Sequence, residues 1–383
     1  MGNKYGKRAW AEIDISKAKH NFFKVKSLLK SGVKLCCVVK ADCYGHSAKI
    51  LAPLYQKWGA DYFAVSSLKE GIELRKINIH KPILILGYTE PKTAYLLEKY
   101  NLSQTVYSKE YADLLLFYCE KFKIKIKVHI KIDTGMGRLG FVCNNTFNLS
   151  PLIEICKNSS FILEGIFTHF SRSDLGKKGK AYTTKQYLNF MHAISYLKQK
   201  GITFPICHAS NSGGIVDYKN FQLDMCRAGL ILYGLCFNKK VKSLFDLKPI
   251  MSFKCVVAST KSVKFNDKIS YGGKRAGFKT KKIAVLPFGY ADGFWRSNFK
   301  KKYKVLLNNT LCKIVGKVCM DQTIIDITKA NAKIGDTVLI FGDNKNCNAT
   351  KLSKLHKTIN YEIVCNLGKR ICRIAIYNKE KNL

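Results

Sequence analysis

Several features that mark other classes of protein are absent from this sequence of 383 residues. No stretch reaches about 18 consecutive apolar residues, so we expect no transmembrane helix, and the N-terminus carries no apolar signal-peptide core. The 15 cysteines show no C-x-x-C spacing, which argues against a disulfide scaffold or a structural zinc site. We therefore expect a cytoplasmic protein with reduced, mostly buried thiols and no bound metal.

Acidic residues are also scarce, with 26 Asp and Glu against 66 Lys and Arg and a formal net charge of +40. Such a charge favours nonspecific attraction to nucleic acid or to an anionic membrane. However, the lysines are spread evenly, and no RRM, helix-turn-helix or zinc-finger pattern accompanies them. We favour solvated surfaces, with no specific nucleic-acid or membrane partner. A basic nucleic-acid-binding protein stays open as a remote alternative.

The first two-thirds of the chain alternates strand-like and helix-like segments. Candidate helices include residues 16–32, where Ser16 can cap the start and Gly32 can close the end. Eight candidate strands fall within roughly 230 residues, which predicts a parallel sheet and favours a closed (β/α)8 barrel of the TIM type. An open doubly wound sheet is the alternative, but no G-x-G-x-x-G follows the first strand. The strands are "VKLCCVVK", "ADYFAVSS", "KPILILGY", "SQTVYS", "IKIKVHIKID", "FILEGIFTHF", "FPICHAS" and "LDMCRAGLILYG".

After about residue 240 the pattern changes to short strands separated by Asn, Asp and Gly turns. We therefore expect an α/β chain with two domains, a barrel over residues 1–240 and a mostly β domain over residues 241–383. The first ~10 residues are candidates to join the second domain.

Polar clusters stand at the ends of five of the candidate strands: Lys40, residues 131–140, His169, residues 208–214 and residues 226–229. Taken singly, each has an ordinary explanation, such as a surface lysine, a core histidine or a glycine-rich turn. Together they favour a site, because active-site groups of such barrels lie at the carboxyl ends of the strands.

The residue types in these clusters suit a phosphorylated cofactor. A lysine at a strand end beside a phosphate-binding loop suits a Schiff base with pyridoxal phosphate (PLP), with Tyr44 as a further hydroxyl and Arg227 near the ring. The small residues that allow backbone N–H groups to approach a phosphate are Ser212, Gly213, Gly214 and Gly229.

With these motifs the chain resembles the bacterial alanine racemases, a PLP-dependent family with a barrel domain and a C-terminal β domain. The resemblance runs over nearly the whole chain. It is carried by "AWAEIDISKAKHN", "VVKADCYGH", "KIDTGMGRLGF", "THFSRSD", "HASNS", "DMCRAGLILYG", "SYGG", "PFGYADG", "VGKVCMDQT" and "TINYEIVCNLGKR".

The resemblance implies a homodimer that interconverts L- and D-alanine by two-base proton transfer and supplies D-alanine for peptidoglycan. Lys40 would bind PLP and act as one base, and Tyr271 of the partner subunit would act as the other. The implied cofactor contacts are Tyr44, His169, Asn211, Ser212, Arg227, Gly229, Leu230 and Tyr361. The implied substrate contacts are Arg138 and the backbone of Met320, supported by Lys131 (a candidate for carbamylation), Asp321, Asp174 and Arg296.

A racemase of broader specificity, or one for serine or lysine, is the nearest alternative. The chain also departs from the family pattern after Lys40, where Asp42 and Cys43 replace the usual Asn-Ala pair. A thiol at this position would make the site sensitive to oxidants.

Overall fold

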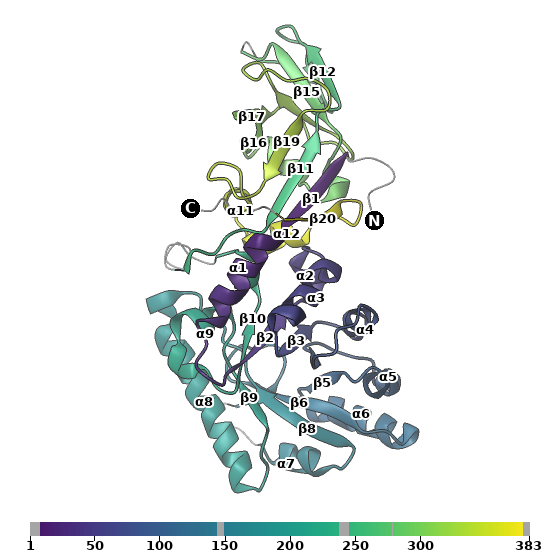
Figure 1. Ribbon diagram of the computed structural model, residues 1–383, viewed down its shortest axis with the longest axis vertical. Helices are drawn as coiled ribbons and strands as arrows, with labels where there is room; N and C mark the ends of the chain where they lie inside the picture. Colours follow the sequence, from purple (N-terminus) through teal and green to yellow (C-terminus); the bar gives the residue numbers. More distant parts are fainter. Residues whose placement is uncertain (1–7, 144–148, 237–244, 278, 378–383) are drawn as a thin grey trace.

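The computed structural model describes residues 8–143, 149–236, 245–277 and 279–377. Figure 1 shows two lobes stacked along the long axis, with a barrel below and a mostly β lobe above. The domain boundary expected between residues 240 and 241 falls within residues 237–244, which lie outside the described residues. No helix in the described ranges is both long and apolar enough to cross a membrane.

The lower lobe is built on eight parallel strands in the order β10-β2-β3-β4-β5-β6-β8-β9. Their bounds are β2 Lys34–Val38, β3 Tyr62–Val65, β4 Ile83–Ile85, β5 Ser103–Val106, β6 Ile126–Asp133, β8 Phe161–Phe167, β9 Ile206–His208 and β10 Met225–Ala228; the short β7 (Phe141–Val142) pairs with β6. The series closes between β9 and β10 through hydrogen bonds from Asp224 N to Cys207 O and from Arg227 N to Ser210 O. The expected parallel barrel is thereby confirmed, in a nearly closed form.

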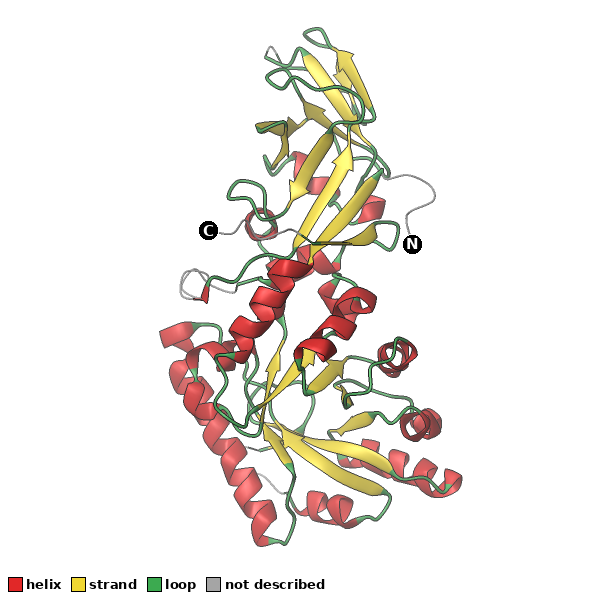
Figure 2. Ribbon diagram, viewed as in Figure 1, coloured by secondary structure: helices red, strands yellow, loops and turns green. Residues whose placement is uncertain are grey.

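Helices follow the strands and cover the outside of the barrel, as Figure 2 shows. Parallel strands need such crossovers, because a tight hairpin cannot return the chain to the same end of the sheet. In the longer helices one apolar face points inward; in α6, for example, Ala112, Leu115 and Cys119 are buried. The bounds are α3 Ala48–Trp58, α4 Leu68–Lys76, α5 Ala94–Lys99, α6 Lys109–Phe122, α7 Ser150–Lys157, α8 Lys180–Gln199 and α9 Ser212–Asp217.

The helix that links the two lobes, α1 (Ile15–Lys26), differs at both ends from the prediction. Asp14, not Ser16, caps its start, and the Asp14 carboxylate accepts a backbone N–H of the first turn at 3.0 Å. A carboxylate is favourable there because it satisfies a free N–H and complements the helix dipole. The helix ends at Ser27, whose N–H bonds back into the last turn, so Gly32 lies beyond it.

The upper lobe is one sheet of nine strands in the order β12-β15-β18-β17-β16-β19-β11-β1-β20. The first described strand, β1, lies between β11 and β20, so the start of the chain belongs to this lobe. The bounds are β1 Ala9–Asp14, β11 Met251–Val256, β12 Ser259–Ser262, β15 Lys282–Leu286, β16 Lys304–Leu307, β17 Thr310–Ile314, β18 Thr323–Asp326, β19 Thr337–Phe341 and β20 Cys372–Ile376. The predicted mostly β second lobe is confirmed.

Smaller elements accompany this sheet, and one of them, α12, meets the barrel. They are the hairpin β13 (Lys268–Ile269) and β14 (Lys274–Arg275), and the helices α11 (Ala349–Leu355) and α12 (Asn360–Cys365). Helix α12 packs on the turn α2 (Lys40–Tyr44) that follows β2, with the Tyr44 and Tyr361 ring centroids 5.9 Å apart. The upper lobe therefore forms one wall above the carboxyl ends of the barrel strands.

Candidate active site

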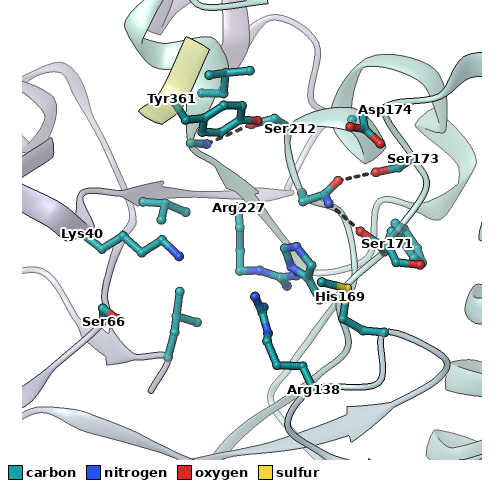
Figure 3. Close-up of a pocket in the computed structure, with 18 of the residues that line it drawn as sticks. Lys40, Ser66, Arg138, His169, Ser171, Ser173, Asp174, Ser212, Arg227 and Tyr361 are labelled. Atoms are coloured by element: carbon teal, nitrogen blue, oxygen red, sulfur yellow. Dashed lines mark hydrogen bonds between the residues drawn. The ribbon is translucent and has the colours of Figure 1, made fainter. Parts of the chain in front are cut away.

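A cavity of about 620 Å³ opens at the carboxyl ends of the barrel strands, a size typical of small-molecule sites. Most of the residues singled out from the sequence meet there, and Figure 3 shows many of them facing one another across it. Those that line the cavity are Lys40, Tyr44, Lys131, Arg138, His169, Asp174, Asn211, Ser212, Gly213, Arg227, Gly229, Leu230 and Tyr361.

Lys40 enters the cavity from an unusual turn. The next four residues, Ala41 to Tyr44, all have φ between 51° and 55°, which makes a single left-handed turn without glycine. Both oxygens of Glu70 tie this turn to the neighbouring strand end, accepting from Ala41 N and Ser66 N at 2.7 Å each. Burial, assisted by the positive charge of Arg138, lowers the pKa of the Lys40 amine, which makes its neutral, nucleophilic form easier to reach.

Hydroxyl groups and a bare backbone form one end of the cavity. Gly229 N donates to Ser212 Oγ at 3.0 Å, and a methyl group added at Gly229 would lie only 2.7 Å from Tyr44 Oη. Burial raises the pKa of both Tyr44 and Tyr361, so both phenols stay protonated donors. This end can surround a small anion such as a phosphate with N–H and O–H groups.

Asn211 lines the cavity, but its side chain hydrogen-bonds to neighbouring residues of the cavity wall. Its Oδ1 accepts from Ser173 Oγ at 2.8 Å and from Gly214 N at 3.0 Å, and its Nδ2 donates to Phe170 O at 3.0 Å. It therefore caps α9 and shapes the loop beneath Ser212.

Arg227 projects from β10 and is almost completely buried. Its Nη1 lies 2.6 Å from His208 Nδ1, and its Nη2 donates to Thr168 O at 2.7 Å and Ala209 O at 3.0 Å and lies 3.4 Å from His169 Nδ1. Burial lowers the pKa of Arg227 to about 10, so the guanidinium stays charged near neutrality. Burial and this cation hold the pKa of His169 well below its usual range, so His169 is neutral.

Lys131 is a buried lysine in a cationic environment. Its ammonium nitrogen lies 5.6 Å from the centre of the Phe167 ring, and burial together with Arg138 lowers its pKa to about 8. Asp133, two residues along β6, is engaged by four backbone N–H groups of the following loop, over residues 135–138, at 2.8–3.1 Å. The Asp133 carboxylate thus organises the turn that carries Arg138.

Gly214 does not line this cavity, and neither do four of the residues whose roles the family resemblance implies. Tyr271 and Met320 lie in the upper lobe with 66% and 52% of their surfaces exposed. Arg296 is also exposed there, and Asp321 pairs with Arg370 at 2.6 Å. Within one described chain, none of the four meets Lys40.

Cys43, next to Tyr44, is completely buried, and burial raises the pKa of its thiol well above the usual range. The expectation that this thiol makes the site sensitive to oxidants is therefore wrong, because reactive thiols are exposed and readily ionised. The thiol at the cavity is instead Cys365, on α12, which is exposed.

Sequence reasoning did not find Glu70, His129 and Glu164, and it included Asp133 and His208 only within the clusters 131–140 and 208–214. A partial signal exists for His129 and Asp133, since they alternate with Lys131 along one strand and period-two neighbours share a face. His208 stands in the motif "HASNS", and Glu164 stands within the apolar strand "FILEGIFTHF", where nothing marks either residue separately.

Comparisons with known proteins extend over both lobes. The model of the alanine racemase N-terminal domain matches residues 13–236 and that of the C-terminal domain residues 250–375. The alanine racemase of Clostridium tetani is 39% identical over 380 residues, which cover 97% of this chain and 96% of that protein. The solved alanine racemase of Clostridium difficile 630 matches with a TM-score of 0.92 at 39% identity, covering 98% of this chain and 97% of that one. The Bacillus anthracis alanine racemase, solved with bound L-Ala-P, matches with a TM-score of 0.90 at 29% identity, covering 98% and 97%.

Proposed function

The chain belongs to the alanine racemase family, and we propose that Lys40 and Tyr271 are the two groups that move the α-proton as it interconverts L- and D-alanine. The racemase activity follows from relatives that match the full length of the chain. The assignment of Lys40 rests on one observation above all. Lys40 enters a cavity whose other walls carry Arg138, Arg227 and a group of hydroxyl and N–H donors at one end.

The family is PLP-dependent, and the residues of the cavity fit that cofactor. Tyr44, Ser212, Tyr361 and the bare backbone at Gly229 suit a phosphate, and Lys40 faces them as the amine that would bind the aldehyde. When bound, PLP supplies an electron sink that acidifies the α C–H bond of the amino acid. The chain's own residues must then orient the substrate and move the proton.

Arg227 and Lys40 have separate tasks in this proposal. Arginine only donates hydrogen bonds, so Arg227 beside the pyridine nitrogen would keep that nitrogen an acceptor. A weaker electron sink limits side reactions such as transamination. Lys40, with a pKa lowered by burial and by Arg138, can exchange a proton at the α-carbon on its own side of the ring.

Tyr271 cannot act within its own chain, since it lies exposed in the upper lobe away from the cavity. We infer a homodimer in which Tyr271 and the backbone of Met320 complete the partner's cavity. The cationic side chains Lys131, Arg138 and Arg227 would favour the phenolate form of a tyrosine brought to that cavity. The exposure of Tyr271 and Met320 agrees with such an interface.

Lys131 is proposed to carry a carbamate. Carbamylation requires a neutral amine, and the pKa of about 8 supplies that form near physiological pH. The product is an anion, which would replace a like-charge contact with Arg138 by an attractive one. A plain amine at Lys131, found by mass measurement of protein kept in bicarbonate, would contradict this assignment.

Mixing two inactive subunits tests the composite site directly. In a heterodimer of K40A and Y271F chains, one site loses both groups and the other keeps both. An equal mixture should therefore regain about a quarter of the wild-type rate. No recovery, in a mixture shown to contain heterodimers, would mean that Tyr271 does not act across the interface.

Solvent exchange tests the two bases. In D2O, Y271F should lose deuterium incorporation at the α-carbon of one alanine enantiomer more severely than of the other, since one face keeps Lys40. Full racemisation in both directions by Y271F would exclude Tyr271 as a base. The same assay with L-serine and L-lysine separates an alanine enzyme, which would supply D-alanine for peptidoglycan, from a racemase of broader specificity.

A further inference from the structure

A file of polar side chains crosses the interior of the barrel beneath the cavity. It runs from Arg227 on β10 through His208 on β9 and His129 on β6 to Glu164 on β8. The two imidazoles are completely buried, Arg227 is 3% exposed, and the Glu164 side chain is 17% exposed. Barrel interiors are usually filled by branched apolar side chains, so these buried polar groups need a physical account.

The hydrogen bonds of this file all point the same way. Arg227 can only donate, so His208 Nδ1, 2.6 Å from Nη1, accepts. Neutral His208 then carries its proton on Nε2 and donates it to His129 Nδ1 at 2.9 Å. His129 in turn carries its proton on Nε2, which faces Glu164 Oε2 at 3.3 Å.

Both imidazoles are neutral, as this direction requires. Burial and the charge of Arg227 hold the pKa of His208 well below its usual range, and burial lowers the pKa of His129 despite Glu164. Each ring thus accepts a hydrogen bond on Nδ1 and donates its single proton from Nε2.

The far end of the file is an ionised carboxylate. Burial opposes ionisation of Glu164, but hydrogen bonds from His129, Ser103 and Tyr62 outweigh it and lower its pKa to about 2. Ser103 Oγ donates to the same Oε2 oxygen that faces His129, and Tyr62 Oη lies 3.3 Å from His129 Nε2. Glu164 Oε2 therefore accepts from Ser103 and faces His129 Nε2, while Tyr62 Oη contacts the same imidazole nitrogen.

Arg227 has no carboxylate of its own. Within the described ranges no ion pair includes it, and its recorded acceptors are the carbonyls of Thr168, His208 and Ala209 and two imidazoles. A buried charge without compensation is costly. Glu164 is the anion to which hydrogen bonds connect this cation.

We propose that Glu164 is a positioning residue for the racemisation: through His129 and His208 it fixes the tautomers that receive Nη1 of Arg227, and so it orients the guanidinium in the cavity. The inference rests on the proposed role of Arg227 beside the pyridine nitrogen. The hydrogen bonds of the guanidinium to described residues use Nη1 and Nη2. The Nε–H is therefore left for a ligand. If the file reversed, His208 Nδ1–H would meet Nη1 donor against donor and displace the guanidinium.

Two substitutions separate the charge of Glu164 from its accepting oxygen. In E164Q the amide oxygen still accepts from His129 Nε2–H but the charge is lost. In E164L both are lost. Replacement of Glu154, an exposed glutamate on α7, by leucine removes the same charge without touching the file and serves as the matched control.

The primary measurement is the tautomer of each ring, from nitrogen chemical shifts of histidine-labelled protein, with and without PLP. His129→Asn and His208→Asn identify the signals. In wild type and E154L both rings should carry the proton on Nε2, with or without cofactor. E164Q should keep this pattern. In E164L only Arg227 still favours it, so a population with the proton on Nδ1 should appear at both rings.

Kinetics provide the second measurement. E164L should lower kcat roughly tenfold to a hundredfold, as misplacement of a cofactor contact does, with KM changed much less, and should raise transamination relative to racemisation. E164Q should lower kcat less than E164L does. A proton on Nδ1 of either ring in wild type, or unchanged tautomers and kcat in E164L, would overturn the inference. If E164L does not fold, the wild-type and E164Q tautomers decide. If the wild-type protein showed no racemase activity, the proposed function would be refuted instead. The tautomers would still test the hydrogen bonds from Arg227 to Glu164.

Discussion

The left-handed turn after Lys40 predicts an unusual effect of glycine. Ala41 has φ 51° and ψ 47° and is exposed at the rim of the cavity, so its methyl group packs little. For an L-residue with a Cβ this conformation places the methyl too close to its own carbonyl group. Ala41→Gly removes that strain while leaving the backbone hydrogen bond from Ala41 N to Glu70 in place.

Two opposing terms set the size of the effect. The left-handed conformation costs a non-glycine residue roughly 1–2 kcal/mol. Glycine gives the unfolded chain more freedom, which costs roughly 0.4–1 kcal/mol. The balance is a stabilisation of about 0.5–1 kcal/mol, which corresponds to a rise in Tm of about 0.5–1 °C for a chain of 383 residues.

Thermal unfolding at one fixed protein and PLP concentration measures this shift, because ligand and subunit association also change Tm. The control is Ala181→Gly, the same substitution at an exposed position in the first turn of the right-handed helix α8, where glycine also destabilises, though by less than the cost of about 1 kcal/mol in a helix interior. The two variants should move Tm in opposite directions. A fall in Tm for Ala41→Gly as large as that for Ala181→Gly would show that the φ angle does not decide the effect.

Three further outcomes follow from the cavity. Gly229→Ala would place a methyl group 2.7 Å from Tyr44 Oη and should weaken PLP binding at least about tenfold in a spectroscopic titration; unchanged affinity would place the phosphate elsewhere. Because the Lys131 amine has a pKa of about 8, its neutral form and hence its carbamate should increase as pH rises through 8, measured with 13C-labelled bicarbonate, and be absent from Lys131→Met. Alkylation of the native protein should reach Cys365 before the buried Cys43, as mass spectrometry of digests would show, although a pKa raised to about 11 by burial will slow the reaction.

The barrel was predictable because its signals are local and repeated. Each of the eight apolar segments singled out in the sequence contains one observed strand of the barrel. Polar residues immediately after those strands had to share one rim, because parallel strands end on the same side. That geometry is why the sequence predicts Lys40, His169 and Arg227 together although they are far apart along the chain.

What the sequence does not show depends on backbone geometry and on a second chain. Nothing in Ala41 or Tyr44 signals a left-handed conformation, since neither residue type favours it. The position of Glu164 depends on a register shift at β6 between Val128 and His129, and periodic patterns do not reveal such irregularities. In the proposed homodimer Tyr271 would meet Lys40 of the other subunit, and single-chain patterning carries no information on that geometry.

The positive charge of the chain and the positive charge of the cavity have different origins. Lysines spread over the surface are individually solvated and need no partner. In contrast, Lys40, Lys131, Arg138 and Arg227 line one cavity, and Asp174 is the only carboxylate among the described residues around it. Cations brought together in a partly desolvated space are unfavourable unless anions join them. A phosphate, a substrate carboxylate and a carbamate on Lys131 would each supply one, so the cavity is electrostatically complementary to a phosphorylated cofactor and an amino acid bound together.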